Sequence, residues 1–188
     1  RGCEGMEPVA VEAFRRHASR GSLGLIEAGL PPGDPALAET RKQQLLDHYA
    51  KHLYDHTRPF KGVEQLLQKL DRRGIGWAIV TNKPEYLTLP LLRHVAGFAS
   101  AGAVICGDTL DRSKPDPAPV KLACELLGVR CGEGLLVGDD ERDIQAGAAA
   151  GTTTVFARYG YGAHVPPNAD RHIDAPLDLL DLLVPDWE

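Results

Sequence analysis

The chain has 188 residues, of which 43% are hydrophobic and 25% charged, and its formal net charge is -5. That length suffices for one main domain with a small satellite. Acidic and basic residues are interspersed without a basic stripe, which argues against binding along a nucleic-acid backbone, and no apolar run approaches the roughly 18 residues of a membrane span. The 4 cysteines are irregularly spaced without a C-x-x-C pair, so we expect a reduced, cytoplasmic protein.

Residues 1–57 carry only helical patterns. Apolar residues recur at helical spacing in VEAFRRHA, in SLGLIEAGL and in ALAETRKQQLLDHYAKHLYDH. The last of these segments places one set of residues on a common apolar face: Leu45, Leu46, Tyr49 and Leu53. A connecting segment with Pro59 and Gly62 follows. We therefore predict a helical domain over residues 1–57 and a second domain over residues 58–188.

From residue 58 onward, strand and helix patterns alternate. The predicted strands are IGWAIVT, AVIC, LLVG and TTTVFA, and the predicted helices span 63–73, 86–95, 118–127 and 144–150. The segments HID and PLDLLDLL add one more strand and helix. Because strands separated by helices need right-handed crossovers, this order predicts an α/β fold with a doubly wound parallel sheet, beside the small helical domain.

Polar residues follow three of the predicted strands, where open parallel sheets bind ligands. Thr81 and Asn82 follow the first strand, Lys114 lies in the loop after the second, and four acids at 139, 140, 141 and 143 follow the third. Each has an ordinary explanation as a helix cap, a loop lysine or a helix start. Four neighbouring acids repel one another unless a cation compensates, however. Together the three places predict phosphate donors beside a Mg²⁺ site, since Mg²⁺ prefers carboxylates, water and phosphate oxygens.

The same segments resemble a known family. VTN at 80–82, KPDP at 114–117 and GDDERD at 138–143 resemble the second, third and fourth motifs of the haloacid dehalogenase-like hydrolases. RPFKGVEQLL, VTNKPE, KPDPAP and VGDDERDIQAGAAAG look closest to its phosphoglycolate phosphatase-like branch, and residues 1–57 look like the helical cap that follows the family's first motif. The resemblance implies a Rossmann-like core and a Mg²⁺-dependent phosphatase that hydrolyses a small phosphorylated metabolite through an aspartyl-phosphate.

The resemblance also implies a role for each matching residue. Thr81 would donate its hydroxyl to the phosphate with Asn82 nearby, and Lys114 would neutralise charge on the phosphoryl group. Asp139 would bind Mg²⁺ directly, and Asp143 would bind it through water or orient Lys114. Asp140 and Glu141 occupy variable positions of the motif and receive no such role.

The helical domain should contain the residues that choose the substrate. Arg20, in the segment RRHASRGSLGL, is one candidate for contacting a substrate carboxylate or sugar hydroxyl. The alternative is that this arginine and its basic neighbours are solvated helix charges.

The family's first motif is a strand that ends in D-x-D-G-T and carries the nucleophilic aspartate, and no such segment precedes the helical domain. Asp34, Asp47 and Asp55 lack an apolar strand before them. In this family that strand lies centrally, between the strands that bear the second and fourth motifs, so its loss would expose two apolar strands. We therefore expect a segment with the nucleophile upstream of Arg1, and we expect residues 1–188 alone to be inactive.

Several alternatives remain open at this stage. The substrate could be phosphoglycolate, N-acetylmuramic acid 6-phosphate or another sugar phosphate, and the chain could instead be an inactive protein that binds a phosphorylated metabolite. His48, His52 and His56 recur every four residues and could bind zinc. Two other classes do not fit the sequence. A response-regulator receiver has its acidic pair first and its lysine last, the reverse of the order here, and a dinucleotide-binding domain needs a G-x-G-x-x-G after a strand, which this sequence lacks. We expect a monomer or a homodimer.

Overall fold

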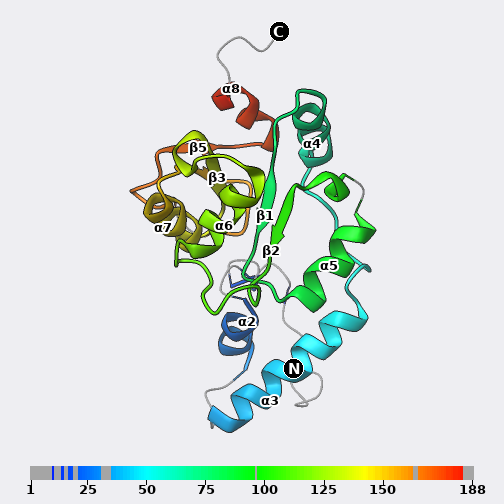
Figure 1. Cartoon of the computed structure of the whole chain (residues 1–188). Coiled ribbons are helices and arrows are strands. Elements are labelled where there is room, and N and C mark those ends of the chain that lie inside the picture. The colour runs from blue at the N-terminus through cyan, green and yellow to red at the C-terminus, as the bar shows by residue number, and fades with distance from the viewer. Residues whose placement is uncertain are drawn as a thin grey trace.

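The computed structural model describes residues 10, 14, 17–18, 21–30, 35–95, 97–162 and 165–183. Most of the predicted helix VEAFRRHA lies outside these residues. The other two predicted helices are present as α2 (Gly21–Gly29) and α3 (Pro35–Lys51), which pack against each other at the lower end of Figure 1. The helix α3 ends five residues earlier than predicted, and of its expected apolar face only Leu53, in the following turn, is buried.

The predicted alternation of strands and helices is confirmed from residue 63 onward. The strands are β1 (Ala78–Val80), β2 (Ala103–Ile105), β3 (Leu135–Gly138), β4 (Thr153–Ala157) and β5 (Arg171–Ile173). The helices are α4 (Val63–Arg72), α5 (Glu85–His94), α6 (Ala118–Leu127), α7 (Glu141–Ala150) and α8 (Leu179–Leu183), with short 3₁₀ turns η3 (Phe98–Ser100), η4 (Cys131–Glu133) and η5 (Pro176–Asp178). None of the described helices is long and apolar enough to cross a membrane.

All strand pairs are parallel, but they form two sheets instead of one continuous sheet. β1 pairs with β2, and β4 lies between β3 and β5. Among the described residues no strand pairs with the second edge of β1 or of β3, and the side chains of both strands are half-buried. In contrast, residues 154–157 of β4 are fully covered. The two sheet edges that the sequence predicts to be exposed are therefore the edges that lack a partner here.

Helices cover both faces of the sheets, as a doubly wound fold requires. On one face Val155 packs among leucines of α4 and α8. On the other face Thr154 lies under Gly147 of α7, because successive residues of a strand point to opposite sides. The helix α6 contacts β1, β2 and α7, so it connects the two sheets. Three helices stop at left-handed glycines at the predicted positions, namely Gly74, Gly128 and Gly151.

Candidate active site

Lys114 connects the carboxyl ends of the two sheets. Its Nζ donates to the carbonyl oxygen of Val80 at 2.5 Å and lies 2.6 Å from Oδ1 of Asp143. Val80 ends β1, and Asp143 lies in the first turn of α7, directly after β3. The side chains of Lys114 and Asp143 are 11% and 10% exposed, so each charge depends on the other for compensation.

Asn82 fixes the backbone of Lys114. Its Nδ2 donates to the carbonyl oxygen of Lys114 at 2.7 Å, and the Lys114 N–H donates to Oδ1 of Asn82 at 3.0 Å. The approach is close on the other side as well, because a Cβ on Gly107 would lie 2.2 Å from the carbonyl oxygen of Asn82. The side-chain amide of Asn82 thus holds the lysine loop in place.

Thr81 continues the ladder of β1 while its hydroxyl stays available as a donor. Its N–H donates to the carbonyl oxygen of Ile105 at 2.9 Å, and its Oγ1 accepts from the N–H of Lys83 at 3.1 Å. Its hydroxyl proton has no acceptor within the described part of the chain. The ordinary explanation, a cap for the next helix, does not hold, since α5 begins after Pro84 without a side-chain cap.

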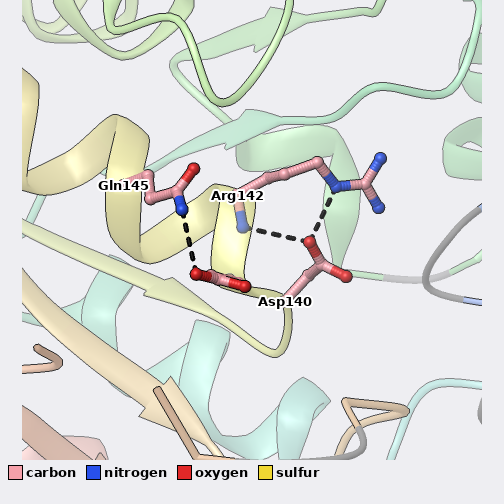
Figure 2. Close-up of a pocket in the computed structure, with 4 residues that line it drawn as sticks. Asp140, Arg142 and Gln145 are labelled. Atoms are coloured by element: carbon pink, nitrogen blue, oxygen red, sulfur yellow. Dashed lines mark hydrogen bonds and ion pairs between the residues drawn. The ribbon is translucent and has the colours of Figure 1, made fainter. Parts of the chain in front are cut away.

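The four neighbouring acidic residues have different hydrogen-bond partners. Asp140 caps α7: its Oδ1 accepts from the N–H of Arg142 at 3.0 Å and from its Nε at 2.7 Å, as Figure 2 shows. The hydrogen bond to Asp140 raises the pKa of Arg142. Oδ2 of Asp143 accepts from the Asp140 N–H at 3.1 Å, and Glu141 accepts from Gln145 at 3.0 Å. Two protein cations, Arg142 and Lys114, therefore offset part of the repulsion.

Asp139 accepts a hydrogen bond from the backbone of the loop that follows β4. Its Oδ2 accepts from the N–H of Tyr161 at 2.6 Å, and it forms no ion pair within the described residues, although its charge adds to the effect of Asp140 in raising the pKa of Arg142. A Cβ on Gly160 would lie 2.3 Å from the Cβ of Asp139, so the loop after β4 packs directly on this carboxylate. Burial, and then the charge of Asp139, raises the pKa of Tyr159. Sequence reasoning missed this loop, although YGYG directly after a strand is a usable signal.

The donor set at the end of β3 fits Mg²⁺ better than zinc. Asp139 and Asp143 are two carboxylates at one strand end, and the described residues contain no group of three or more His, Cys, Asp or Glu side chains that could hold a metal ion. Mg²⁺ commonly takes one or two carboxylates and completes its shell with water and phosphate oxygens, whereas structural zinc needs a full set of protein ligands. Within the described part of the chain no such group forms around His48, His52 and His56 either, which counts against zinc there, although the rings of His48 and His52 are 4.5 Å apart.

The predicted site residues fall into three groups. Asn82, Lys114 and Asp143 form one hydrogen-bonded cluster, and Thr81 adjoins it in the chain. Asp139 lies at the end of β3 under the loop that follows β4. Arg20 lies outside the described residues.

Three comparisons with known proteins identify the family of the chain. A family model described as haloacid dehalogenase-like hydrolase matches residues 1–151. The chain is 36% identical to N-acetylmuramic acid 6-phosphate phosphatase of Pseudomonas aeruginosa, over 97% of this chain and 83% of the relative, and 37% identical to phosphoglycolate phosphatase of Xylella fastidiosa, over 85% and 70%. A crystal structure of a predicted phosphoglycolate phosphatase from Haemophilus somnus superposes with a TM-score of 0.80 at 26% identity, covering 93% of this chain and 83% of that one.

The chain therefore belongs to the haloacid dehalogenase-like hydrolases. Within that family, its relatives and structural neighbours place it in the phosphoglycolate phosphatase-like branch. The two relatives named above are both phosphatases.

Proposed function

We propose that the protein hydrolyses the phosphate monoester of a small metabolite with Mg²⁺, and that phosphoglycolate is the substrate. The observation that carries the proposal is the buried ammonium of Lys114, held at the sheet ends by Val80 and Asp143. A fixed cation and the available hydroxyl donor of Thr81 suit a phosphoryl group, which is negatively charged in the ground state and in the transition state. The relative that acts on N-acetylmuramic acid 6-phosphate supports this compound or another sugar phosphate as the alternative substrate.

Each polar residue has a distinct part in the proposed reaction. Thr81 donates its hydroxyl proton to a phosphoryl oxygen, and Lys114 neutralises charge on the phosphoryl group. Asn82 holds the backbone of Lys114 through two hydrogen bonds and so acts by positioning. Fixed donors of this kind lower the barrier because they need no reorganisation when charge develops on the oxygens.

Asp139 and Asp143 are the residues that would hold Mg²⁺. The bound ion would supply positive charge to the phosphoryl oxygens. Asp143 also orients Lys114, because its Oδ1 lies 2.6 Å from the ammonium. The hydrogen bond from Tyr161 holds Oδ2 of Asp139, and because a carboxylate is planar it also sets the direction of Oδ1.

The covalent step needs a carboxylate that attacks phosphorus, and we assign it to a segment upstream of Arg1. The half-buried edge strands β1 and β3, which flank the predicted position of that strand, support the assignment. Residues 1–57 would then be the cap that sets specificity and residues 58–188 the core. If the natural protein has no such segment, the same site would bind phosphate without hydrolysing it.

Phosphate release tests the proposal. The natural full-length protein is assayed with phosphoglycolate, N-acetylmuramic acid 6-phosphate and p-nitrophenyl phosphate, in Mg²⁺ and in EDTA. Asp139→Asn should lower release by about 100-fold or more, the scale of losing one electrostatic contact in the transition state, whereas the exposed control Asp111→Asn should not. Absence of release from all three esters in Mg²⁺ would overturn the enzymatic function, and binding of inorganic phosphate by that preparation would favour the binding protein.

A further inference from the structure

Lys83, in the loop after β1, contacts the helix α3. It follows Asn82 directly, and its Nζ donates to the hydroxyl oxygen of Tyr49 in α3 at 2.7 Å. The same ammonium lies 4.6 Å from the centroid of the Tyr49 ring, and both residues are half-buried. The contact joins residues 34 positions apart, so it places α3 beside the loop that carries Thr81 and Asn82.

The backbone of Lys83 is held while its side chain reaches toward α3. The N–H of Lys83 donates to Oγ1 of Thr81 at 3.1 Å, and its carbonyl oxygen accepts from the N–H of Gly107 at 2.9 Å and from Oγ1 of Thr88 at 3.2 Å. These three bonds fix the backbone of Lys83 beside Thr81, and the hydrogen bond to Tyr49 holds the ammonium.

The charge of Lys83 is not compensated by an acid among the described residues. Lys114 pairs with Asp143, whereas the partner of Lys83 is a neutral phenol. A half-buried ammonium without a counter-charge favours an anion from outside the chain. Because Lys83 donates to the phenol oxygen, the phenol proton remains, and it has no acceptor in the described part of the protein. The pair thus offers two donors to one anion.

We propose that Lys83 and Tyr49 bind a carboxylate on the leaving group of the substrate, an inference that rests on the proposed phosphatase function. The phosphoryl group would lie at Thr81 and Lys114, and the carboxylate would accept from the Lys83 ammonium and the Tyr49 hydroxyl. Two neighbouring donors suit the two oxygens of a carboxylate. Phosphoglycolate and N-acetylmuramic acid 6-phosphate, the compounds for which two relatives are named, both carry a carboxylate in addition to the phosphate ester. The pair would select such esters over neutral ones.

The test compares two phosphate esters that differ in the carboxylate. Phosphoglycolate and ethyl phosphate are titrated into the protein in Mg²⁺ buffer by calorimetry, and free phosphate is measured at the end of each titration. The wild type should bind phosphoglycolate about tenfold more tightly, the effect of one charge-assisted hydrogen bond. Lys83→Met should bring the two Kd values together without changing the Kd of ethyl phosphate, and Tyr49→Phe should reduce the preference. The exposed control Lys121→Met should keep it.

Different outcomes would overturn different claims. Equal affinity of the wild type for both esters, or an unchanged preference in Lys83→Met, would overturn the carboxylate site and leave the proposed function intact. Binding of neither ester would overturn the proposed function and this inference with it. If the contact between Lys83 and Tyr49 only stabilises the fold, Lys83→Met will unfold at a lower temperature and keep the ligand preference, and this result would also overturn the carboxylate site. Lys83→Arg, which keeps the charge, should retain the preference for phosphoglycolate.

Discussion

The ammonium of Lys114 and the carboxylate of Asp143 lie 2.6 Å apart with about one tenth of each side chain exposed. The lysine comes from the loop after β2 and the aspartate from the helix after β3, so the ion pair joins the two sheets. A buried charge that loses its partner is far more costly than a surface charge that does so. This difference leads to the first prediction.

Lys114→Met should lower the free energy of unfolding by about 3 kcal/mol, because it leaves Asp143 charged and buried. Urea denaturation measures the change. Lys42→Met is the matched control, since Lys42 lies 3.1 Å from Glu39 on the surface and its loss should cost less than about 1 kcal/mol. Adding Asp143→Asn to Lys114→Met should recover part of the loss. Equal effects of Lys114→Met and Lys42→Met would contradict the buried pair.

Gly138→Ala should displace Asp143 and weaken the site. A Cβ at Gly138 would lie 2.3 Å from the Cβ of Asp143, and contacts that short force a shift. We expect a stability loss of about 1–3 kcal/mol and weaker binding of phosphate, measured by urea denaturation and calorimetry. Gly132→Ala is the control, because the nearest atom to its added Cβ is 3.8 Å away. Phosphate affinity that is unchanged in Gly138→Ala would show that Asp143 does not depend on this close approach.

The thiol of Cys124 should make the fold sensitive to alkaline pH. Burial, followed by a hydrogen bond to the Cys131 thiol, raises the pKa of Cys124 from 9.0 to about 12. The folded state therefore holds the proton more tightly than the unfolded state. This contribution to stability is fully present below pH 9.0 and is lost as the pH rises toward about 12.

Urea denaturation at about pH 8 and about pH 10.5 tests the sign. The wild type should lose more stability over this interval than Cys124→Ala. Burial also raises the pKa of Cys106, so the variant should keep part of the slope. If the wild type and Cys124→Ala lose the same stability between the two pH values, Cys124 does not contribute to the pH dependence.

Local sequence patterns predicted the helices and strands well, but they did not predict which distant residues contact each other. The glycines at 74, 128 and 151 mark helix ends because left-handed backbone favours glycine, and this signal is local. The ordered motifs at 80–82, 114–117 and 138–143 predicted which strand ends carry polar residues, because parallel strands present their carboxyl ends at one edge. The groups that those polar residues contact depend on how the chain folds and cannot be read from the local sequence.

Three features could not be read from local pattern. Asn82 engages the backbone of Lys114, which is 32 residues away, with both atoms of its amide. The loop after β4 holds Asp139 through the backbone N–H of Tyr161, and although YGYG marks the loop, its residue types do not show which side chain the backbone donor contacts. The division into two sheets depends on ladder bonds, which apolar patterning does not specify.

Calorimetric titration of residues 1–188 with inorganic phosphate, in Mg²⁺ and in EDTA, tests the phosphate site itself. We expect saturable binding that is tighter in Mg²⁺ and is weakened by about tenfold in Thr81→Val, which lacks the hydroxyl donor. This experiment does not depend on a nucleophile. No binding in Mg²⁺, or binding that neither Mg²⁺ nor Thr81→Val alters, would contradict a phosphate site at the ends of β1 and β3.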